Sequence, residues 1–203
     1  MSSTQDPLPD AARAAKRPTT VLAGRYGHPL HPALVALPIG IWTASVLLDL
    51  GSHVVDAAPT AAHAAWWLLG LGVLSALAAA GLGFLDLLAI PPGTRAWQVA
   101  LTHMGCNLGA TTLFAVAWLV RRDDVAPAAG TSWPDLLLSL VALALLGAGG
   151  FLGGELAYRY GVRVADEQTQ ADGFTSRAGA GRRAAVRGDR SSGAGSPRTT
   201  KES

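Results

Sequence analysis

The chain has 203 residues, of which 50% are hydrophobic and only 15% are charged. A soluble domain of this size carries about 25% charged residues, so the composition excludes an ordinary soluble enzyme as the default interpretation. The net charge is +2, and the basic residues gather near the termini, so no nucleic-acid partner is expected. The single cysteine, Cys106, excludes an internal disulfide and any metal site that needs several cysteines of one chain.

The N-terminal region is expected to be a disordered arm on the cytoplasmic side. Residues 1–24 are polar and contain several alanines and prolines. They are not a signal peptide, because the first apolar segment begins about 30 residues into the chain and no small-x-small cleavage site follows it.

Four long apolar segments follow, and they predict an all-α integral membrane bundle of four transmembrane helices over residues 25–164. The expected spans are about 32–50, 62–89, 95–120 and 134–158. A helix needs about 20 apolar residues to cross the hydrocarbon core of a bilayer, and the uncharged stretches have roughly this length. The sequence shows no strand-like alternation, and short internal strands would leave backbone groups unpaired in lipid. The lipid bilayer is therefore the first expected partner.

The positions of the basic residues predict the orientation. Arg25, Arg95, Arg159 and Arg163 fall on one side of the predicted membrane, whereas only Arg121 and Arg122 fall on the other. By the positive-inside rule both termini are cytoplasmic. Residues 165–203 are rich in Arg, Gly, Ser and Ala, and this composition predicts a disordered basic tail. The six tryptophans lie mostly near the predicted span ends, as expected for aromatic belts.

Small residues recur at helical spacing within the spans. They form the series Gly72, Ala76, Ala79, Gly83 and the pairs Gly105/Gly109, Gly149/Gly153 and Gly150/Gly154. Such faces favour close helix packing within one chain or in a homo-oligomer. The same missing side chains could instead leave room for a flat cofactor.

Several polar residues lie where hydrocarbon is expected, and such residues are by default candidates for a functional site. The set is His28, His31, Asp86, His103, Asn107, Glu155 and Tyr158. In the predicted topology all of them fall in the cytoplasmic half of the membrane. A second set, Asp49, His53, Asp56 and His63, falls in or near an outer loop and is expected to be exposed and without a special role.

Four interpretations of the cytoplasmic cluster remain open. His103 with His31 or His28, beside Asn107, could ligate a haem iron in a slot between helices. Histidines and carboxylates could hold a divalent metal. Asp86, His103 and Glu155 could relay protons or couple to an ion. Finally, the cluster could only join the helices by hydrogen bonds, since polar groups in lipid must be paired.

The sequence resembles DUF2231, a bacterial membrane family without an assigned function. The resemblance is carried by GHPLHPALV at residues 27–35, which leads into LPIGIW at 37–42 and to Asp49. It continues with GLGFLD at 81–86, His103, Asn107, GGEL at 153–156 and YRYGV at 158–162. It covers residues 25–164 and implies a four-helix integral membrane protein. Some members are fused to Rieske iron–sulfur or cytochrome-like modules, which implies a redox partner of that kind.

Together these observations predict a small multi-pass protein of the bacterial inner membrane. We expect a non-enzymatic subunit or accessory protein of a membrane redox system that binds haem through the histidine cluster. The alternatives are a proton- or ion-coupled transporter and a purely structural membrane anchor.

Overall fold

The computed structural model describes residues 10–172 and residue 174 of the chain. It divides into two compact units, residues 1–164 and residues 165–203. In the described part of the second unit, one short helix forms, α7 (Glu167–Asp172). The first unit contains α1 (Asp10–Lys16), η1 (Val21–Ala23), β1 (Gly24–Arg25), β2 (His28–Pro29), α2 (Leu30–Leu34), α3 (Ala36–Gly51), α4 (Ala58–Leu87), α5 (Arg95–Val120), α6 (Trp133–Gly154) and the π-helical turn η2 (Glu155–Arg159).

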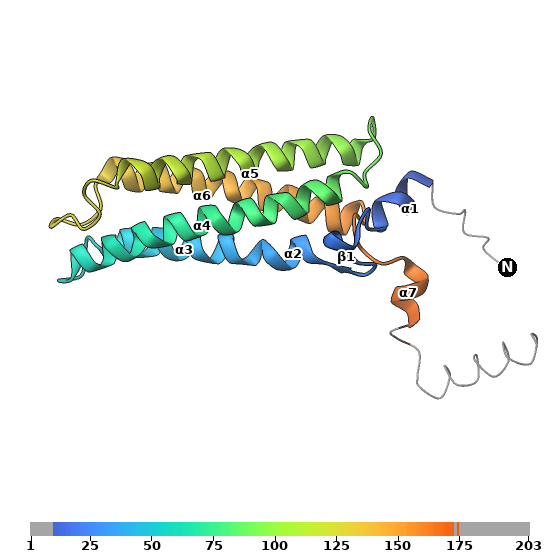
Figure 1. Ribbon diagram of the computed structural model, residues 1–203, viewed down its shortest axis with the longest axis horizontal. Helices are drawn as coiled ribbons and strands as arrows, with labels where there is room; N and C mark the ends of the chain where they lie inside the picture. The colour runs from blue at the N-terminus through green and yellow to red at the C-terminus, as the bar shows by residue number, and fades with distance from the viewer. Residues whose placement is uncertain (1–9, 173, 175–203) are drawn as a thin grey trace, which may run out of the picture. The chain divides into compact units, whose positions relative to one another are not determined.

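The four long helices lie side by side along most of their length (Figure 1). They follow one another around a ring in the order α3, α4, α5, α6, with the closest pairing between α3 and α4 and between α5 and α6. Four segments are long and apolar enough to cross a membrane: Leu30–Gly51, Ala58–Leu87, Arg95–Val120 and Trp133–Arg159. The prediction of an all-α bundle with four transmembrane helices is therefore confirmed.

Local sequence explains where these helices begin. Thr94 caps α5, since its hydroxyl accepts from the backbone N–H of Trp97, and Ser132 caps α6 by accepting from Asp135. Proline occupies the first turn of α4 and of α6, where its missing N–H costs nothing. Within the first span, Pro38 has no N–H to donate to the carbonyl of Leu34, which accounts for the interruption between α2 and α3.

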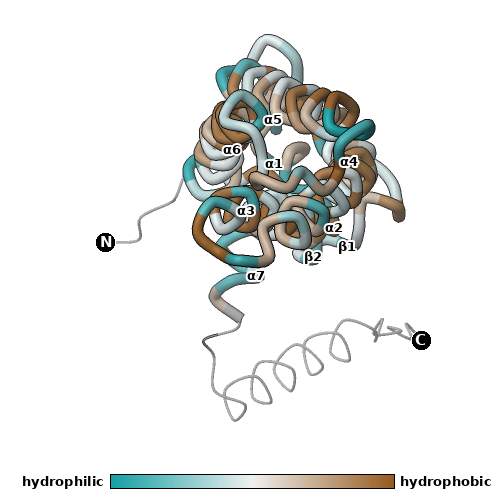
Figure 2. Tube along the Cα trace, turned by 90° about the vertical axis from the view of Figure 1, so that its left-hand side faces the viewer, coloured by the Kyte–Doolittle hydropathy of each residue, from teal (hydrophilic) through white to brown (hydrophobic). Residues whose placement is uncertain are grey.

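The outward faces of the four helices are apolar. Leu74, Leu137 and Phe151 have 66%, 62% and 77% of their surfaces exposed, as expected for side chains that contact lipid. Figure 2, in which the helices are viewed end on, shows hydrophobic residues around the ring. Inside the ring, Trp42 stacks on Phe114 with ring centres 4.2 Å apart. Trp42 is only 1% exposed, so it is a core residue and not part of an aromatic belt.

The N-terminal region differs from the expected disordered arm. Residues 10–25 form α1, η1 and β1, and Ala15 and Ala23 are both buried. β1 pairs with β2 in antiparallel register, Gly24 opposite Pro29 and Arg25 opposite His28. The sequence did not predict this ordered structure, because short side chains such as Ala15 can pack against the end of a bundle without belonging to an apolar segment. Residues 1–9 and, within the predicted tail, residues 173 and 175–203 lie outside the described part.

The two helical hairpins, α2/α3 with α4 and α5 with α6, are structurally equivalent. Each residue of α2/α3 corresponds to the residue 72 positions later, in α5 or at its end. In three such pairs the two equivalent residues also contact each other across the bundle: His31 with His103, Trp42 with Phe114, and Asp49 with Arg121. In the second helix of each hairpin the offset is 70 positions. There the buried residues Leu69, Gly72, Ala76 and Ala79 of α4 correspond to the buried residues Ser139, Ala142, Leu146 and Gly149 of α6. The bundle thus has an approximate two-fold axis along its length.

Asp49 and Arg121 form a buried ion pair at the end of the bundle opposite the histidines, which we call the Asp49 end. The Arg121 guanidinium donates to both carboxylate oxygens at 2.9 and 3.0 Å, and the two side chains are 4% (Arg121) and 0% (Asp49) exposed. Thr131 donates its hydroxyl proton to Asp49 at 2.6 Å, and Arg121 also donates to Thr131 and to the carbonyl of Ala62. The pair is therefore held by several further hydrogen bonds, as buried charges require.

Removing one member of this pair tests its role. Arg121→Gln leaves the Asp49 carboxylate buried without its counter-charge, and we expect the free energy of unfolding to fall by about 3–5 kcal/mol. Arg122→Gln is the matched control, because Arg122 is exposed beside Asp123 and should change stability by less than about 0.5 kcal/mol. Unfolding by denaturing detergent measures both values. Equal losses in the two variants would contradict a buried, stabilising pair.

Candidate functional site

His31 lies in α2 at the end of the bundle where α3 and α5 begin, which we call the histidine end. Its Nδ1 atom is 2.9 Å from the backbone carbonyl of Ala79 in α4. The ring packs against Gly83, one turn further along α4. A methyl group at Gly83 would lie 2.8 Å from the imidazole Cε1 atom, so the helix surface can receive the ring only because this position is glycine.

His103 lies in α5 and repeats this arrangement in the second hairpin. Its Nδ1 atom is 2.7 Å from the backbone carbonyl of Gly149 in α6, and its ring packs against Gly153, where a methyl group would lie 3.0 Å from Cε1. Asn107 follows one turn later, donates to the carbonyl of His103 at 2.7 Å, and holds its amide nitrogen 3.3–3.4 Å from both ring nitrogens. The site thus has the same ring–carbonyl–glycine unit twice, with Asn107 on one side only.

The two imidazoles meet across the bundle. Their ring centres are 6.4 Å apart and their planes are nearly perpendicular, at 87°. A carbonyl can only accept a hydrogen bond, so in each ring Nδ1 carries the proton, and in the neutral ring Nε2 keeps a lone pair. Histidines that bind metals are typically oriented in this way by a carbonyl on the other nitrogen. We refer to His31 and His103 as the histidine pair.

The predicted cluster is only partly brought together. His31, His103 and Asn107 meet, whereas Asp86 pairs with Arg163, whose Nε atom lies 2.7 Å from the carboxylate. Arg163 is buried, and its guanidinium also donates to the carbonyl of Ala23. The carboxylate thus has its own counter-charge at the histidine end.

The remaining predicted residues lie apart from the histidine pair. Glu155 accepts hydrogen bonds from Arg159 and from the Tyr160 hydroxyl, each at 3.1 Å. Tyr158 is 93% exposed and belongs to the outer surface. His28 is exposed in β2. Among the described residues, Asp86 is therefore paired with Arg163 and Glu155 is hydrogen-bonded to Arg159 and Tyr160, and neither contact includes His103.

Sequence reasoning missed the importance of three residues. Asp49 was expected to be exposed, and Arg121 and Arg163 were considered only as charges flanking the membrane. A signal for Asp49 and Arg121 exists in the sequence, since each follows by 18 positions the histidine of its own hairpin. Arg163 carries no comparable signal, because its position depends on a left-handed backbone at φ 60°.

The small-residue positions also find their explanation here. The space beside Gly83, Gly149 and Gly153 is filled by the side chains of His31, Asn107 and His103, and the space beside Gly72 is filled by Trp42. In contrast, a methyl group added at Gly105 or at Gly150 would have no neighbouring atom within 4 Å. Gly72, Gly83, Gly149 and Gly153 therefore serve to admit polar and aromatic side chains from neighbouring helices.

This contrast gives a test of the site. We expect Gly153→Ala to lower the free energy of unfolding by about 1–3 kcal/mol, because the new methyl group displaces the His103 ring. Gly150→Ala, three residues earlier, meets open space and should leave stability unchanged or raise it by up to about 1 kcal/mol. Thermal unfolding in detergent measures the difference. A Gly153→Ala protein as stable as Gly150→Ala would show that the ring is free to move away.

The comparisons with known proteins bear on the whole membrane region. Residues 27–166 match the model of DUF2231, a family described as a predicted membrane protein. No curated protein and no solved structure matches the chain. The matched region contains all four apolar helices and the histidine pair. The chain is therefore a membrane protein with four transmembrane helices, and it belongs to the DUF2231 family.

Proposed function

We propose that this chain is a non-enzymatic subunit of a membrane redox system that holds one haem between His31 and His103. The observation that carries the proposal is the histidine pair itself, with ring centres 6.4 Å apart and with each Nδ1 directed to a carbonyl. A ring nitrogen lies about 2 Å from a bound metal, so two imidazoles on opposite sides of one metal have ring centres about 6 Å apart. The observed spacing supports the proposal that His31 and His103 would hold the haem iron.

The number of donors favours haem over a bare metal ion. In the described part of the chain, no three or more His, Cys, Asp or Glu side chains gather in a way that could hold a metal. A Zn²⁺ ion takes three or four protein ligands, which two histidines do not supply. Haem iron needs only axial ligands from the protein, because the macrocycle provides the other four.

The residues of the chain would orient and insulate the haem. The carbonyls of Ala79 and Gly149 keep the two rings in one tautomer and one orientation. Asn107, which corresponds to the apolar Val35 in the first hairpin, places an amide beside His103 only. A bound haem would supply one-electron redox chemistry, and the surrounding apolar helices would keep water away from it.

The same proposal covers location and partners. The asymmetry of basic residues supports an orientation with both termini in the cytoplasm. The family resemblance supports a location in a bacterial inner membrane and a Rieske-type or cytochrome redox partner. A reporter that is active only in the periplasm, fused after Ser203, tests the orientation. We expect the reporter fused after Ser203 to be inactive and a reporter fused in the loop after Asp123 to be active. The reverse result would contradict the orientation.

An absorption spectrum tests the haem. The detergent-purified protein, expressed with haem precursor supplied, should show a Soret band that sharpens on reduction by dithionite. Replacing either member of the histidine pair, His31→Ala or His103→Ala, should remove that spectrum, because both side chains would be needed to hold the haem iron.

His28→Ala is the matched control, since His28 lies three residues from His31 but outside the pair. Glu155→Gln is a second control, because Glu155 bonds to Arg159 and Tyr160. Both should retain the spectrum. A flat visible region with haem available in the host, or a spectrum lost equally in His28→Ala, would contradict the proposal.

A further inference from the structure

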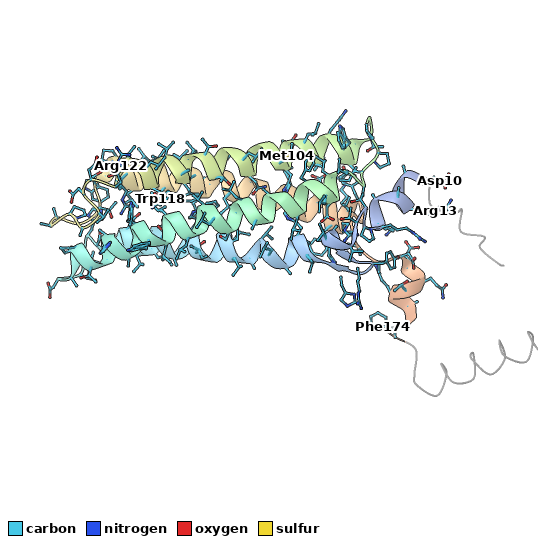
Figure 3. The ribbon with its side chains drawn as sticks, viewed as in Figure 1. Asp10, Arg13, Met104, Trp118, Arg122 and Phe174 are labelled. Atoms are coloured by element: carbon cyan, nitrogen blue, oxygen red, sulfur yellow. The ribbon has the colours of Figure 1, made fainter. Side chains whose placement is uncertain are left out.

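The segment Asp10–Ala23, which we call the cap segment, lies across the histidine end of the bundle. Figure 1 places α1 at this end, and the view along the bundle in Figure 2 places it within the ring of helices. Figure 3 shows Asp10 and Arg13 of α1 at this end, whereas Trp118 and Arg122 lie toward the Asp49 end. The cap segment thus lies at the same end of the bundle as His31 and His103.

The buried face of the cap segment lies close to the histidine pair. Ala15 is 5% exposed, and it packs in an apolar cluster with Leu87, Ile90, Ala100, Leu156 and Val162. Ala100 precedes His103 by three residues, and Leu156 follows Gly153 by three. Three residues are about one helical turn. The cluster that holds Ala15 therefore lies about one helical turn from His103 and from Gly153, toward the histidine end of the bundle.

Arg163 fastens the cap segment to the bundle. Its backbone N–H donates to the carbonyl of Ala15 at 2.9 Å, and its guanidinium donates to the carbonyl of Ala23 at 2.7 Å. Its Nε atom lies 2.7 Å from Asp86, close to the end of α4. One residue thus connects two points of the cap segment to the helix that carries Ala79 and Gly83.

Besides the contacts of Arg163, the cap segment is held by a hydrogen bond from the Thr19 hydroxyl to the carbonyl of Leu85 at 3.0 Å and by the burial of Ala15 and Ala23. Within α1 only Ala15 is buried, and a single methyl group contributes little apolar burial. Arg163 has φ 60°, a conformation that is strained for a residue with a side chain, and its Nη1 atom is buried without a hydrogen-bond partner. Opening would relieve this strain and hydrate that nitrogen, which partly offsets the loss of the ion pair. Segments of this kind open at far lower cost than a whole fold.

From these contacts we propose that the cap segment opens and closes the histidine end of the bundle, with Arg163 as its latch, and thereby controls the access of water and of a ligand to His31 and His103. The proposal rests on the proposed function only for the nature of the ligand, haem. The opening itself is a property of the chain and can be measured without haem.

The test is hydrogen exchange at the imidazole Cε1 position, followed by peptide mass spectrometry in D₂O on the full chain in lipid nanodiscs, without added haem. His63, exposed near the Asp49 end, is the internal reference. Ala15→Asp places a charge in the apolar cluster and should favour the open state, so exchange at His31 and His103 should rise about fivefold or more, with His63 unchanged. Ala14→Asp is the matched control, because Ala14 is exposed and the added charge is the same.

Arg163→Gly provides a second variant, because glycine adopts φ 60° without strain but removes the latch. It should raise exchange at the same two histidines. Two results would contradict the proposed opening of the cap segment. One is unchanged exchange in both variants with native helicity by circular dichroism, and the other is an equal rise of exchange in Ala14→Asp. Faster exchange in a protein that never binds haem would support the opening of the cap segment and contradict the proposed function. Haem binding with unchanged exchange would support the proposed function and contradict the opening of the cap segment.

Discussion

Each hairpin of this bundle is joined at one end by an imidazole that donates a hydrogen bond to a backbone carbonyl of the neighbouring helix. In hydrocarbon a polar side chain has no water to bond, so it must find its partner within the protein. A helix carbonyl can accept such a second bond only where the facing surface lets the ring approach, which explains why Gly83 and Gly153 lie beside the two rings. The positions of Gly83 and Gly153 and the orientation of the two Nε2 atoms follow from this one requirement.

Hydropathy predicted the four membrane helices well, because a long uncharged segment has few alternatives to a transmembrane helix. Depth along the predicted helices also placed His31, His103 and Asn107 in the same half of the membrane. Depth does not reveal rotation about a helix axis, however, and therefore Asp86 and Glu155 were grouped with the histidines although each has its own partner. Order at the N-terminus was missed for a different reason, since Ala15 and Ala23 are buried through contacts with distant residues and not through a local apolar pattern.

The equivalence of the two hairpins was also present in the sequence, although weakly. His31, Trp42 and Asp49 repeat the spacing of His103, Phe114 and Arg121, but only histidine is identical in the two sets. Trp42 and Phe114 are similar in shape, and Asp49 and Arg121 are complementary in charge, but neither relation appears as identity in the amino-acid sequence. The three pairs become recognisable once the structure shows that equivalent residues meet each other at the centre of the bundle.

The ion pair at the Asp49 end has a consequence for assembly. If a first hairpin associated with another first hairpin, two aspartates would face each other in a buried position, and two second hairpins would oppose two arginines. Like charges in such a place repel strongly and lack solvent to weaken the repulsion. Each half is therefore complementary only to the other half. Two copies of the chain that exchange hairpins would preserve the buried pair of Asp49 and Arg121, so the charge pair selects the partner hairpin without selecting the chain to which it belongs.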